Sequence, residues 1–539
     1  MGKMNRVDTI MQYHQCSKHS YHSFAPGPGH LDWESQPDPF RRYDGAEVVF
    51  LKQIPSGKRP FFAEALDPSP VSVSPLNFET LSRLFFDSLA ISAWKSFQGS
   101  RWALRVNPSS GNLHPTESYL ISGPLEGLST DPSISHYSPL IHGLEMRAGF
   151  PVETWKKIVD GFPEDTIFIG LSSVYWRESW KYGLRAFRYC HHDLGHALAA
   201  VSFACAGLGW RAVLMDHMGN DDLEVILGLS EKKGAEAEIP DCLVAVFPSA
   251  NEWKIKKQRL KDDFASLSWN GTANILSKDH VEWPGIMEVS QNSEKPFTGD
   301  FPDSNIRTGS LYNLVEADSF SLRKAIHQRR SAVAMDGTTR IGRETFYQFL
   351  IKTVPQACPL PFQSLPWDSQ VHLGLFVHRV DDLPAGLYFL LRNKSHLEEL
   401  QSKFKQEFLW KKPEGCPAEL NLFLLEEGDY RGTASSVSCG QAIASDGCFS
   451  LGMIAAFEGP LGEHGPWFYP RLYWECGAIG QVLYLQAEVS GIRSTGIGCF
   501  FDDPVHEIFG IGDMSYQSLY HFTVGGPVED TRLTTLPPY

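Results

Sequence analysis

One pattern occurs twice in this chain, 282 residues apart, and this repeat strongly limits what the chain can fold into. Each copy reads as a short helix that ends at a glycine and leads into an apolar stretch typical of a β-strand. A constant offset indicates duplication of a folding unit, with chance similarity as the alternative. The copies are Asp221–Leu229 before the strand Cys242–Phe247, and Asp503–Ile511 before the strand Leu519–Val524. The residue pairs at this offset are Gly209 and Gly491, Asp221 and Asp503, and Gly228 and Gly510.

The length of the chain also favours two domains. A chain of 539 residues is too long for a single hydrophobic core. The clearest break is 251–320, because the basic patch Lys254–Lys261 is followed by stretches rich in Ser, Asn, Asp and Pro. Within it, Trp283–Met287 is expected to dock on a domain. We expect an N-terminal domain at 1–250 with an N-terminal extension at 1–75, a connector at 251–320, and a C-terminal domain at 321–539.

Apolar periodicity predicts helices and strands in mixed order, which is an α+β pattern. The segment 193–209 is apolar nearly all round, as expected of a helix buried on several sides, and 473–490 is its counterpart. Other predicted helices are 77–92, 321–330 and 344–354, and other predicted strands are 371–377 and 420–425.

Charge and cysteine content narrow the class of protein. The formal net charge of −15 argues against a surface for nucleic acid or for an anionic membrane. The ten cysteines are scattered without a C-x-x-C pair, so neither a disulfide framework nor a zinc site is expected. Met1–Gln15 is polar, unlike a signal peptide, and Leu194–Met215 is expected to be a buried helix and a strand rather than a membrane span. We therefore expect a soluble, cytoplasmic protein.

A polar loop of unusual composition, 105–117, precedes the strand-like segment Ser118–Ser122. Its proline fixes the backbone, and Gly111 permits the close approach of a flat ligand. The side chains that can meet such a ligand are those of Pro108, Ser109, Ser110 and Asn112. An ordinary polar loop before a strand is the alternative. The whole string resembles the flavin-contacting loop of the nitroreductase superfamily, in particular its SagB/ThcOx-type, azoline dehydrogenase-like branch.

The resemblance implies FMN as the cofactor and two tandem nitroreductase-like, three-layer α-β-α domains. Members of the superfamily are usually homodimers with FMN at the subunit interface, so the two related halves would form a pseudo-dimer within one chain. The family's phosphate-binding motif is matched by Arg329, Arg330 and Ser331. Guanidinium groups can hold a phosphate bidentately. The alternative is a solvated basic helix end that complements the helix dipole.

Each half lacks one part of this set, so one FMN per chain is expected. The first half has no Arg-Arg-Ser motif, and its beginning offers Lys18 and His19 at most. The second half has no Pro-Ser-Ser-Gly-Asn loop, and its segment 359–366 resembles that loop only in its prolines. The complete site is expected to combine 108–112 with 329–331.

Two further segments resemble parts of the family's flavin site. The segment 491–498 stands where the family's loop passes over the flavin, and a Gly-rich turn into a strand is the alternative. The cofactor-binding residues that it implies are Thr495, Gly496, Ile497 and Gly498. Arg532 resembles the family's C-terminal basic residue near the phosphate. Where many members have a cation near the flavin, this chain has Val333, and Arg105 is our candidate to replace that charge.

The segment Trp180–Tyr189 resembles the Lys-Tyr segment of the azoline dehydrogenases, which implies a catalytic role for Lys181 and Tyr182. A partly desolvated lysine can act as a base near neutrality. A strand-to-helix junction with a surface lysine and a packed tyrosine is the alternative. His192 and His196 have the spacing of a zinc site, but no Glu completes the metalloprotease pattern, so no metal is expected and Asp193 is expected to cap the helix.

Together these features predict an FMN-dependent oxidoreductase that transfers hydride or electrons through flavin N5, with NAD(P)H as a candidate reductant. We expect a monomer with a small-molecule or peptide-derived substrate, and neither nucleic acid nor a membrane as partner. Two alternatives stay open. The protein could be a peptide thiazoline or oxazoline dehydrogenase that works with a partner, or a non-catalytic flavin-binding or scaffold protein.

Overall fold

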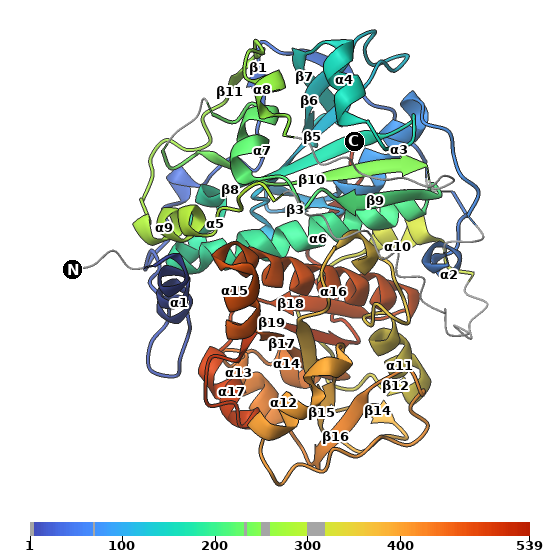
Figure 1. Ribbon diagram of the computed structural model, residues 1–539. Helices are drawn as coiled ribbons and strands as arrows, with labels where there is room; N and C mark the ends of the chain where they lie inside the picture. The colour runs from blue at the N-terminus through green and yellow to red at the C-terminus, as the bar shows by residue number, and fades with distance from the viewer. Residues whose placement is uncertain (1–4, 56, 68–70, 231–233, 249–258, 299–318) are drawn as a thin grey trace.

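Each half of the chain is built around one large antiparallel sheet, and the two sheets lie above and below a central layer of helices (Figure 1). The computed structural model describes residues 5–55, 57–67, 71–230, 234–248, 259–298 and 319–539. In sheet order, the N-terminal strands are β2 (Glu47–Phe50), β7 (Gly143–Gly149), β6 (Ser133–Ser138), β5 (Thr116–Ser122), β8 (Ile167–Val174), β10 (Glu238–Pro248) and β9 (Trp210–Leu214). The C-terminal strands are β16 (Leu422–Glu427), β15 (Gly386–Leu390), β13 (Val371–Val377), β17 (Phe449–Ala456), β19 (Tyr516–Gly525) and β18 (Arg493–Ile497).

The two sheets have the same strand order. When strands are matched by their place along the chain, β7-β6-β5-β8-β10-β9 corresponds to β16-β15-β13-β17-β19-β18, and β2 is an additional edge strand. The predicted strands at 242–247, 371–377 and 519–524 are confirmed within β10, β13 and β19, whereas β16 begins two residues later than predicted. The observed fold is therefore α+β, as the mixed periodicity indicated.

Two long helices, α6 (Ala186–Ala206) and α16 (Tyr469–Val489), pack against each other at the centre of the molecule (Figure 1). Both are buried along nearly their whole length, which explains why neither has a polar face. Two glycines bring their backbones together, since a Cβ on Gly195 would overlap the carbonyl oxygen of Trp474 and one on Gly477 would overlap that of His192. Gly195 and Gly477 are 282 positions apart, and so are His192 and Trp474. The two contacts are therefore equivalent under the offset of the repeat.

Shorter helices connect the strands, and several of them pack against the two central helices. The helices predicted at 77–92, 321–330 and 344–354 are confirmed as α3 (Phe78–Ser88), α10 (Leu322–Gln328) and α11 (Arg343–Ile351), each somewhat shorter than predicted. The repeated helix-glycine units are α7 (Asn220–Ile226) and α17 (Asp502–Phe509), followed by Gly228 and Gly510 at positive φ. Other elements are α2 (Phe62–Leu66), α4 (Val152–Ile158), α5 (Tyr175–Tyr182), α12 (Leu397–Lys403), α13 (Arg431–Val437), α14 (Ile443–Asp446), α15 (Glu458–His464), β12 (Ile341–Gly342) and β14 (Val380–Asp381).

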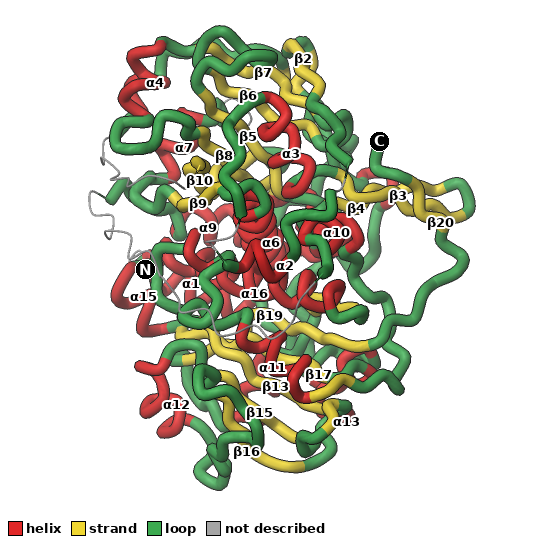
Figure 2. Tube along the Cα trace, turned by 90° about the vertical axis from the view of Figure 1, so that its right-hand side faces the viewer, coloured by secondary structure: helices red, strands yellow, loops and turns green. Residues whose placement is uncertain are grey.

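Segments near each end of the chain cross to the other half. At the start, α1 (Arg6–Cys16) packs against the C-terminal half, where His14 contacts Tyr469 and Gln517. At the end, β20 (Thr534–Leu536) joins β3 (Ile91–Phe97) and β4 (Ser100–Arg105) in a three-stranded sheet. Figure 2 shows this sheet extending from the side of the molecule, and its inner edge borders the site described below.

Part of the expected connector is folded onto the N-terminal half. Residues 259–298 contain α8 (Lys261–Phe264), α9 (Pro284–Asn292) and β11 (Thr272–Ala273), which pairs with β1 (Tyr43–Asp44). The docking expected of Trp283–Met287 is observed, because this segment begins α9 and Ile286 is buried. The remaining parts of the connector and most of its basic patch lie outside the described residues.

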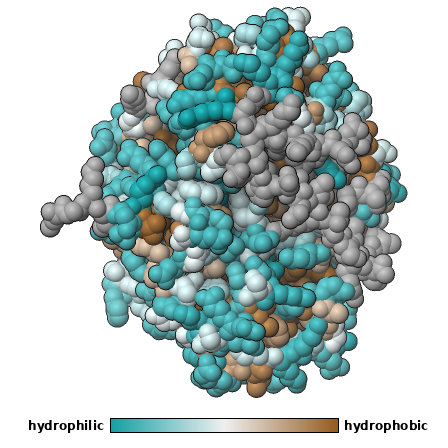
Figure 3. Space-filling model, viewed as in Figure 1, coloured by the Kyte–Doolittle hydropathy of each residue, from teal (hydrophilic) through white to brown (hydrophobic). Residues whose placement is uncertain are grey.

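The surface is mostly hydrophilic on the face seen in Figure 3, with apolar side chains scattered rather than gathered in one patch. None of the helices in the described ranges has the length and apolar character needed to cross a bilayer. The same ranges contain no group of three or more His, Cys, Asp or Glu side chains arranged to hold a metal ion.

Candidate functional site

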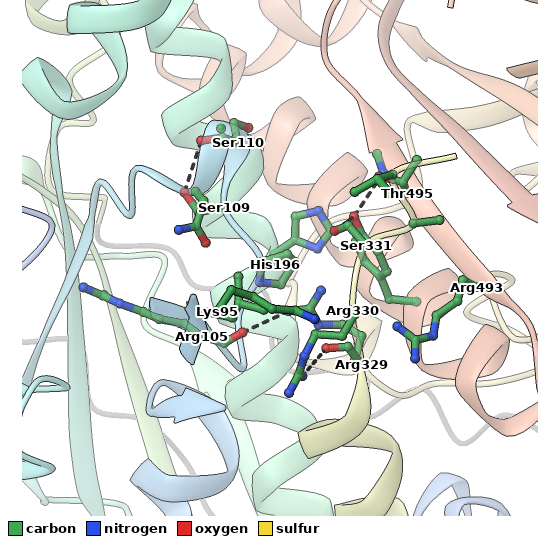
Figure 4. A pocket seen from close by; sticks show the side chains of 18 of the residues that line it. Lys95, Arg105, Ser109, Ser110, His196, Arg329, Arg330, Ser331, Arg493 and Thr495 are labelled. Atoms are coloured by element: carbon green, nitrogen blue, oxygen red, sulfur yellow. Dashed lines mark hydrogen bonds between the residues drawn. The ribbon is translucent and has the colours of Figure 1, made fainter. Parts of the chain in front are cut away.

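A cavity of about 850 Å³ lies between the two halves and is lined by residues from both. Figure 4 shows it with the loop at 108–112 on one side, the arginines that follow α10 on another, and β18 opposite the loop. Of the predicted residues, those that line it are Pro108, Ser109, Ser110, Asn112, Tyr182, Arg329, Arg330, Ser331, Thr495, Gly496, Ile497 and Gly498. Segments more than two hundred positions apart in the sequence therefore meet at one place, which is large enough for a cofactor.

The loop at 108–112 is held in a fixed shape by its own polar groups. Gly111 and Asn112 both have positive φ, 59° and 61°, which turns the chain sharply. The Ser109 hydroxyl accepts a hydrogen bond from the amide of His114 at 2.8 Å, and the Asn112 amide donates to the carbonyl of Ala103 at 2.8 Å. The side chains of Ser109 and Asn112 are thus committed to shaping the loop, which presents its backbone and Ser110 to the cavity.

Three arginines form the cationic end of the cavity. Arg329 is buried, donates from Nη2 to the carbonyl of Arg105 at 2.9 Å, and leaves its Nε without a partner. Burial, together with the neighbouring charges of Arg329 and Arg493, lowers the pKa of Arg330 to about 10. The nearby counter-charges are Glu488, 3.2 Å from Arg493 Nε, and Glu529, 3.7 Å from Arg493 Nη2. Cations crowded in this way would be stabilised by a bound anion.

The segment 491–498 is a Gly-rich turn into a strand, which is the alternative to a loop over the ligand. Arg493–Ile497 forms β18, an edge strand of the C-terminal sheet, and Ser494 also makes a parallel bridge with Ser331. Two tyrosines fix its position, since the amide of Gly496 donates to the Tyr484 hydroxyl at 3.1 Å and the Tyr189 hydroxyl donates to the carbonyl of Gly498 at 3.0 Å. Its small residues let the backbone itself form the wall of the cavity.

Lys181 and Tyr182 end α5 directly beneath the loop. A Cβ placed on Gly111 would lie 3.2 Å from Lys181 Nζ and 2.5 Å from the Tyr182 hydroxyl, and the positive φ of Gly111 also favours glycine there. The Lys181 ammonium lies 5.2 Å from the centre of the Tyr182 ring. Burial and the nearby Glu178 carboxyl raise the pKa of Tyr182 well above 10, so the phenol is neutral. Both predicted catalytic side chains are thus at the base of the loop, and Tyr182 reaches the cavity.

Two buried carboxyl groups, Glu178 and Asp193, lie behind the same loop. Asp193 accepts hydrogen bonds from the Ser110 amide at 2.9 Å and the Ser110 hydroxyl at 3.0 Å. Burial raises the pKa of Asp193 to about 7. Burial and the charge of Asp193 raise the pKa of Glu178 well above its ordinary range. The expectation that Asp193 caps a helix was wrong, because α6 begins seven residues earlier, at Ala186, and Asp193 anchors the loop from within that helix.

Three other predictions fare differently. Arg532 does not line the cavity, because Asp530 holds its guanidinium at 2.8 Å on the exposed surface. Val333 lines the cavity edge and is 70% exposed, so no cation stands at that position. Arg105 does line the cavity, although two of its nitrogens donate to the carbonyls of Thr116 and Pro39.

Sequence reasoning missed several residues of the site. Lys95 reaches it from β3, and His196 and Tyr520 lie at its centre (Figure 4 labels Lys95 and His196). Burial lowers the pKa of His196 to about 3, so this histidine is neutral and hydrogen-bonds Gln481 and Tyr520. Arg493 belongs to the segment 491–498, of which only Thr495–Gly498 are predicted to bind the cofactor. The sequence offered no signal for Lys95 or Tyr520, because each reaches the cavity only through tertiary packing.

The duplication implies a second position, related to this cavity, where the equivalent segments of the opposite halves meet. That position is nearly closed. The segment 359–366 packs beside β9, the counterpart of β18, and leaves a hollow of about 40 Å³. Phe61 before α2 pairs with Ser321 before α10, so these helices are neighbours. The residues after α10 are Arg329–Ser331, whereas α2 is followed by Asp67, an acid. Lys18 and His19, the only candidates from the first half, contact Asp503 and Asp502 instead.

Comparison with known proteins supports the fold. No protein-family model and no curated protein matches the sequence. A solved structure of a provisionally assigned nitroreductase from Anabaena variabilis ATCC 29413 superposes with a TM-score of 0.69 and 20% identity, covering 96% of this chain and 99% of the other. The chain thus has a nitroreductase-like α+β fold.

Two other solved structures each match 38% of the chain. One is the Escherichia coli microcin synthetase McbBCD complex with truncated pro-MccB17 bound, at 16% identity and a TM-score of 0.28, with 70% of that chain covered. The other is a provisionally assigned NAD(P)H:FMN oxidoreductase from Staphylococcus epidermidis ATCC 12228, at 12% identity and a TM-score of 0.21, with 87% covered.

Proposed function

We propose that this protein is an FMN-dependent oxidoreductase with one FMN bound in the cavity between two tandem nitroreductase-like domains. The observation that carries the proposal is the meeting of the loop at 108–112, Arg329–Ser331 and β18 around one cavity of about 850 Å³. Each of these segments resembles a different part of a nitroreductase flavin site. The matching strand orders of the two sheets and the shared offset of 282 support duplication of one domain and the intrachain pseudo-dimer.

The donor set of the cavity fits FMN. The phosphate would lie at the cationic end, where Arg329, Arg330 and Arg493 offer guanidinium donors and the buried Arg329 Nε has no partner among the described residues. The flat ring would lie against the loop at 108–112, where the backbone of Gly111 allows close approach. Lys95 and Arg105 are the cations that could replace the charge missing at Val333.

When bound, FMN would supply hydride and electron transfer through its N5 atom. The chain's own residues position the substrate and move protons. We assign to Lys181 the exchange of a proton with the substrate at Nζ, and to the neutral Tyr182 hydroxyl the donation of a hydrogen bond to it. Asp193 and the loop that it anchors keep both side chains under Gly111, and the burial of Glu178 and Asp193 excludes water from that side.

The proposal has two forms, which differ in the direction of the reaction. In one form NAD(P)H is the candidate reductant of the flavin. In the other the protein oxidises peptide thiazolines or oxazolines with the help of a partner, and the Lys181-Tyr182 pair is the feature that favours this form. The exposed Val333 and the closed second position favour a rival, a non-catalytic flavin-binding or scaffold protein.

Two measurements on purified full-length protein test the proposal. One is the FMN-to-protein ratio, and the other is the absorbance spectrum before and after addition of NADPH. We expect a yellow protein with one FMN per chain that NADPH bleaches. A ratio near two would overturn the single site, and a protein that neither carries nor takes up FMN would overturn the flavin. A chromophore that no reductant-coupled assay turns over would favour the non-catalytic rival.

Two variants separate binding from chemistry. Arg330→Ala should weaken FMN binding by roughly tenfold to a hundredfold, while the matched change Arg532→Ala, outside the cavity, should leave it unchanged. Lys181→Ala should retain the flavin spectrum but lower turnover of a true substrate by about a hundredfold. Unchanged turnover in Lys181→Ala would exclude Lys181 as the base.

A further inference from the structure

A pair of cysteines stands at the wall of the same cavity and has no part in the proposed flavin chemistry. Cys499, which follows β18, lines the cavity, and Cys439 lies behind it in the turn between α13 and α14. Their sulfur atoms are 2.7 Å apart, and both side chains are partly exposed. Because a disulfide has an S–S bond of about 2.05 Å, only a small closing movement would join them.

The two segments that carry these cysteines are already tied together. Gln441 donates hydrogen bonds to the carbonyls of Ser438 and Cys499, at 2.8 and 3.0 Å, and the Phe501 amide donates to the carbonyl of Val437 at 2.7 Å. Cys439 has a positive φ of 56°, which is uncommon for a residue with a side chain. Hydrogen bonds made by residues on both sides of Cys439 in the sequence therefore hold its segment, and its thiol, close to Cys499.

The surroundings make the two thiols chemically different. The hydrogen bond between the Cys439 and Cys499 thiols lowers the pKa of Cys499, and His19 and the charge of Arg185 lower it further against the effect of burial. The same contact raises the pKa of Cys439, as does burial. The other charged group facing the pair is Asp502, which is held by Arg185 at 3.0 Å and by Arg188 at 2.7 Å. Cys499 is thus suited to act as the nucleophile in thiol–disulfide exchange. Cys439 is suited to stay protonated until it attacks in a second step.

The remaining cysteines do not share these features. Six of the other eight are buried, and burial leaves a thiol inert. Cys16 is exposed but has no cysteine partner, and the thiol of the partly exposed Cys416 points to the backbone carbonyls of Pro417 and Leu420. Within the described residues, proximity, access and an electropositive environment come together at Cys439 and Cys499.

We propose that Cys439 and Cys499 form a thiol–disulfide redox pair that opens on the cavity and takes a low-molecular-weight disulfide as its oxidant. In the first step the Cys499 thiolate attacks one sulfur of the disulfide, whose S–S bond breaks and whose other half leaves as a thiolate that takes up a proton. In the second step Cys439 loses its proton and attacks Cys499 Sγ, which expels the second thiolate. The protein dithiol loses two electrons and two protons, and the small disulfide becomes two thiols.

Oxidised glutathione is the probe for the test, with full-length protein whose free thiols are then alkylated and mapped by peptide mass. We expect a Cys439–Cys499 disulfide to form about tenfold faster than Cys16 forms a mixed disulfide. Cys439→Ser should stop at a mixed disulfide on Cys499, and Cys499→Ser should give neither product. Cys416→Ser is the matched control and should behave as the unsubstituted protein.

Two outcomes would overturn the proposal. One is that both thiols of the unsubstituted protein stay free while Cys16 reacts, and this result needs no variant to fold. The other is that Cys439→Ser is modified at Cys416 and Cys499 at the same rate. Because the thiols are mapped by mass with or without flavin, failure of this proposal is distinct from failure of the flavin proposal.

Discussion

At the residue scale, a buried cluster of charges is centred on β5 and β6, a few residues beyond the loop at 108–112. Glu117, just beyond the loop, accepts hydrogen bonds from Arg177 at 2.5 Å and from His136 at 3.1 Å. His136 also contacts Glu145 at 2.8 Å through its other nitrogen, so it must carry both protons to serve both carboxylates. Burial alone would lower its pKa, but the hydrogen bonds to Glu117 and Glu145 raise the pKa of His136 to about 9.

This cluster makes stability depend on pH in a stated direction. A histidine whose pKa is raised on folding contributes its full stability below its ordinary pKa of about 6.5 and loses it as pH rises through about 9. His136→Gln should therefore lower the free energy of unfolding by about 3 kcal/mol near neutrality and remove this pH dependence. Urea unfolding on both sides of this window measures the effect, with the exposed His22→Gln as control. If the free energy of unfolding fell by the same amount between the two pH values in His136→Gln and in the unsubstituted protein, the prediction would be contradicted.

At the element scale, α6 and α16 pack through glycines rather than through interlocking side chains. Gly195 and Gly477 each meet the backbone of the opposite helix, where no Cβ can be placed without moving a carbonyl group. Because backbone cannot yield as a flexible side chain does, we expect Gly195→Ala or Gly477→Ala to destabilise the protein by about 2 kcal/mol or more.

The control for this prediction is a helical glycine with open space around it. Gly459 and Gly462 in α15 have nothing within 4 Å of an added Cβ. Alanine there should leave stability unchanged or raise it by up to about 1 kcal/mol, since alanine is the better helix former. Thermal unfolding of the four variants separates the two cases. If the α6 and α16 variants were as stable as the α15 variants, the close crossing would not exist in solution.

The sequence predicted the elements better than the positions of their side chains. Periodicity located the two central helices and the strand β13, because burial and patterning act locally along the chain. It gave Arg532 as a residue near the phosphate, whereas in the structure the guanidinium of Arg532 pairs with Asp530, two residues earlier. It left open whether 491–498 is a loop over the ligand or a turn into a strand, because the Thr and Gly residues of β18 lack the apolar alternation that identifies most strands. Lys95 could not be foreseen, since it reaches the cavity only when β3 pairs with β20.

At the scale of the whole molecule, the two halves share their interior. One continuous group of buried apolar residues includes side chains of both central helices and both sheets. A buried ion cluster also joins the halves, since Arg185, just before α6, and Arg188 within α6 hold Asp502 of α17 at 3.0 and 2.7 Å. The exchange of segments near the two ends of the chain adds further contacts across the same boundary.

We therefore expect the chain to unfold in one cooperative transition, although it contains two similar sheets. Asp502→Asn should lower the temperature of that single transition, because it leaves two buried arginines without their counter-charge, at a cost of about 3 kcal/mol or more. The arginines hold the pKa of Asp502 well below 3.8. Its stabilisation is therefore present above that pH and is lost as the pH falls below it.

Differential scanning calorimetry measures both the number of transitions and their shift. The matched control is Asp530→Asn, which breaks an exposed ion pair with Arg532 and should leave the transition where it is. A thermogram of Asp502→Asn with two separate transitions, one of them at the original temperature, would show that one half keeps its stability without the other. That result would contradict a shared core, and it would also weaken the case for a cofactor held between the halves, because a site built from both needs them to stay together.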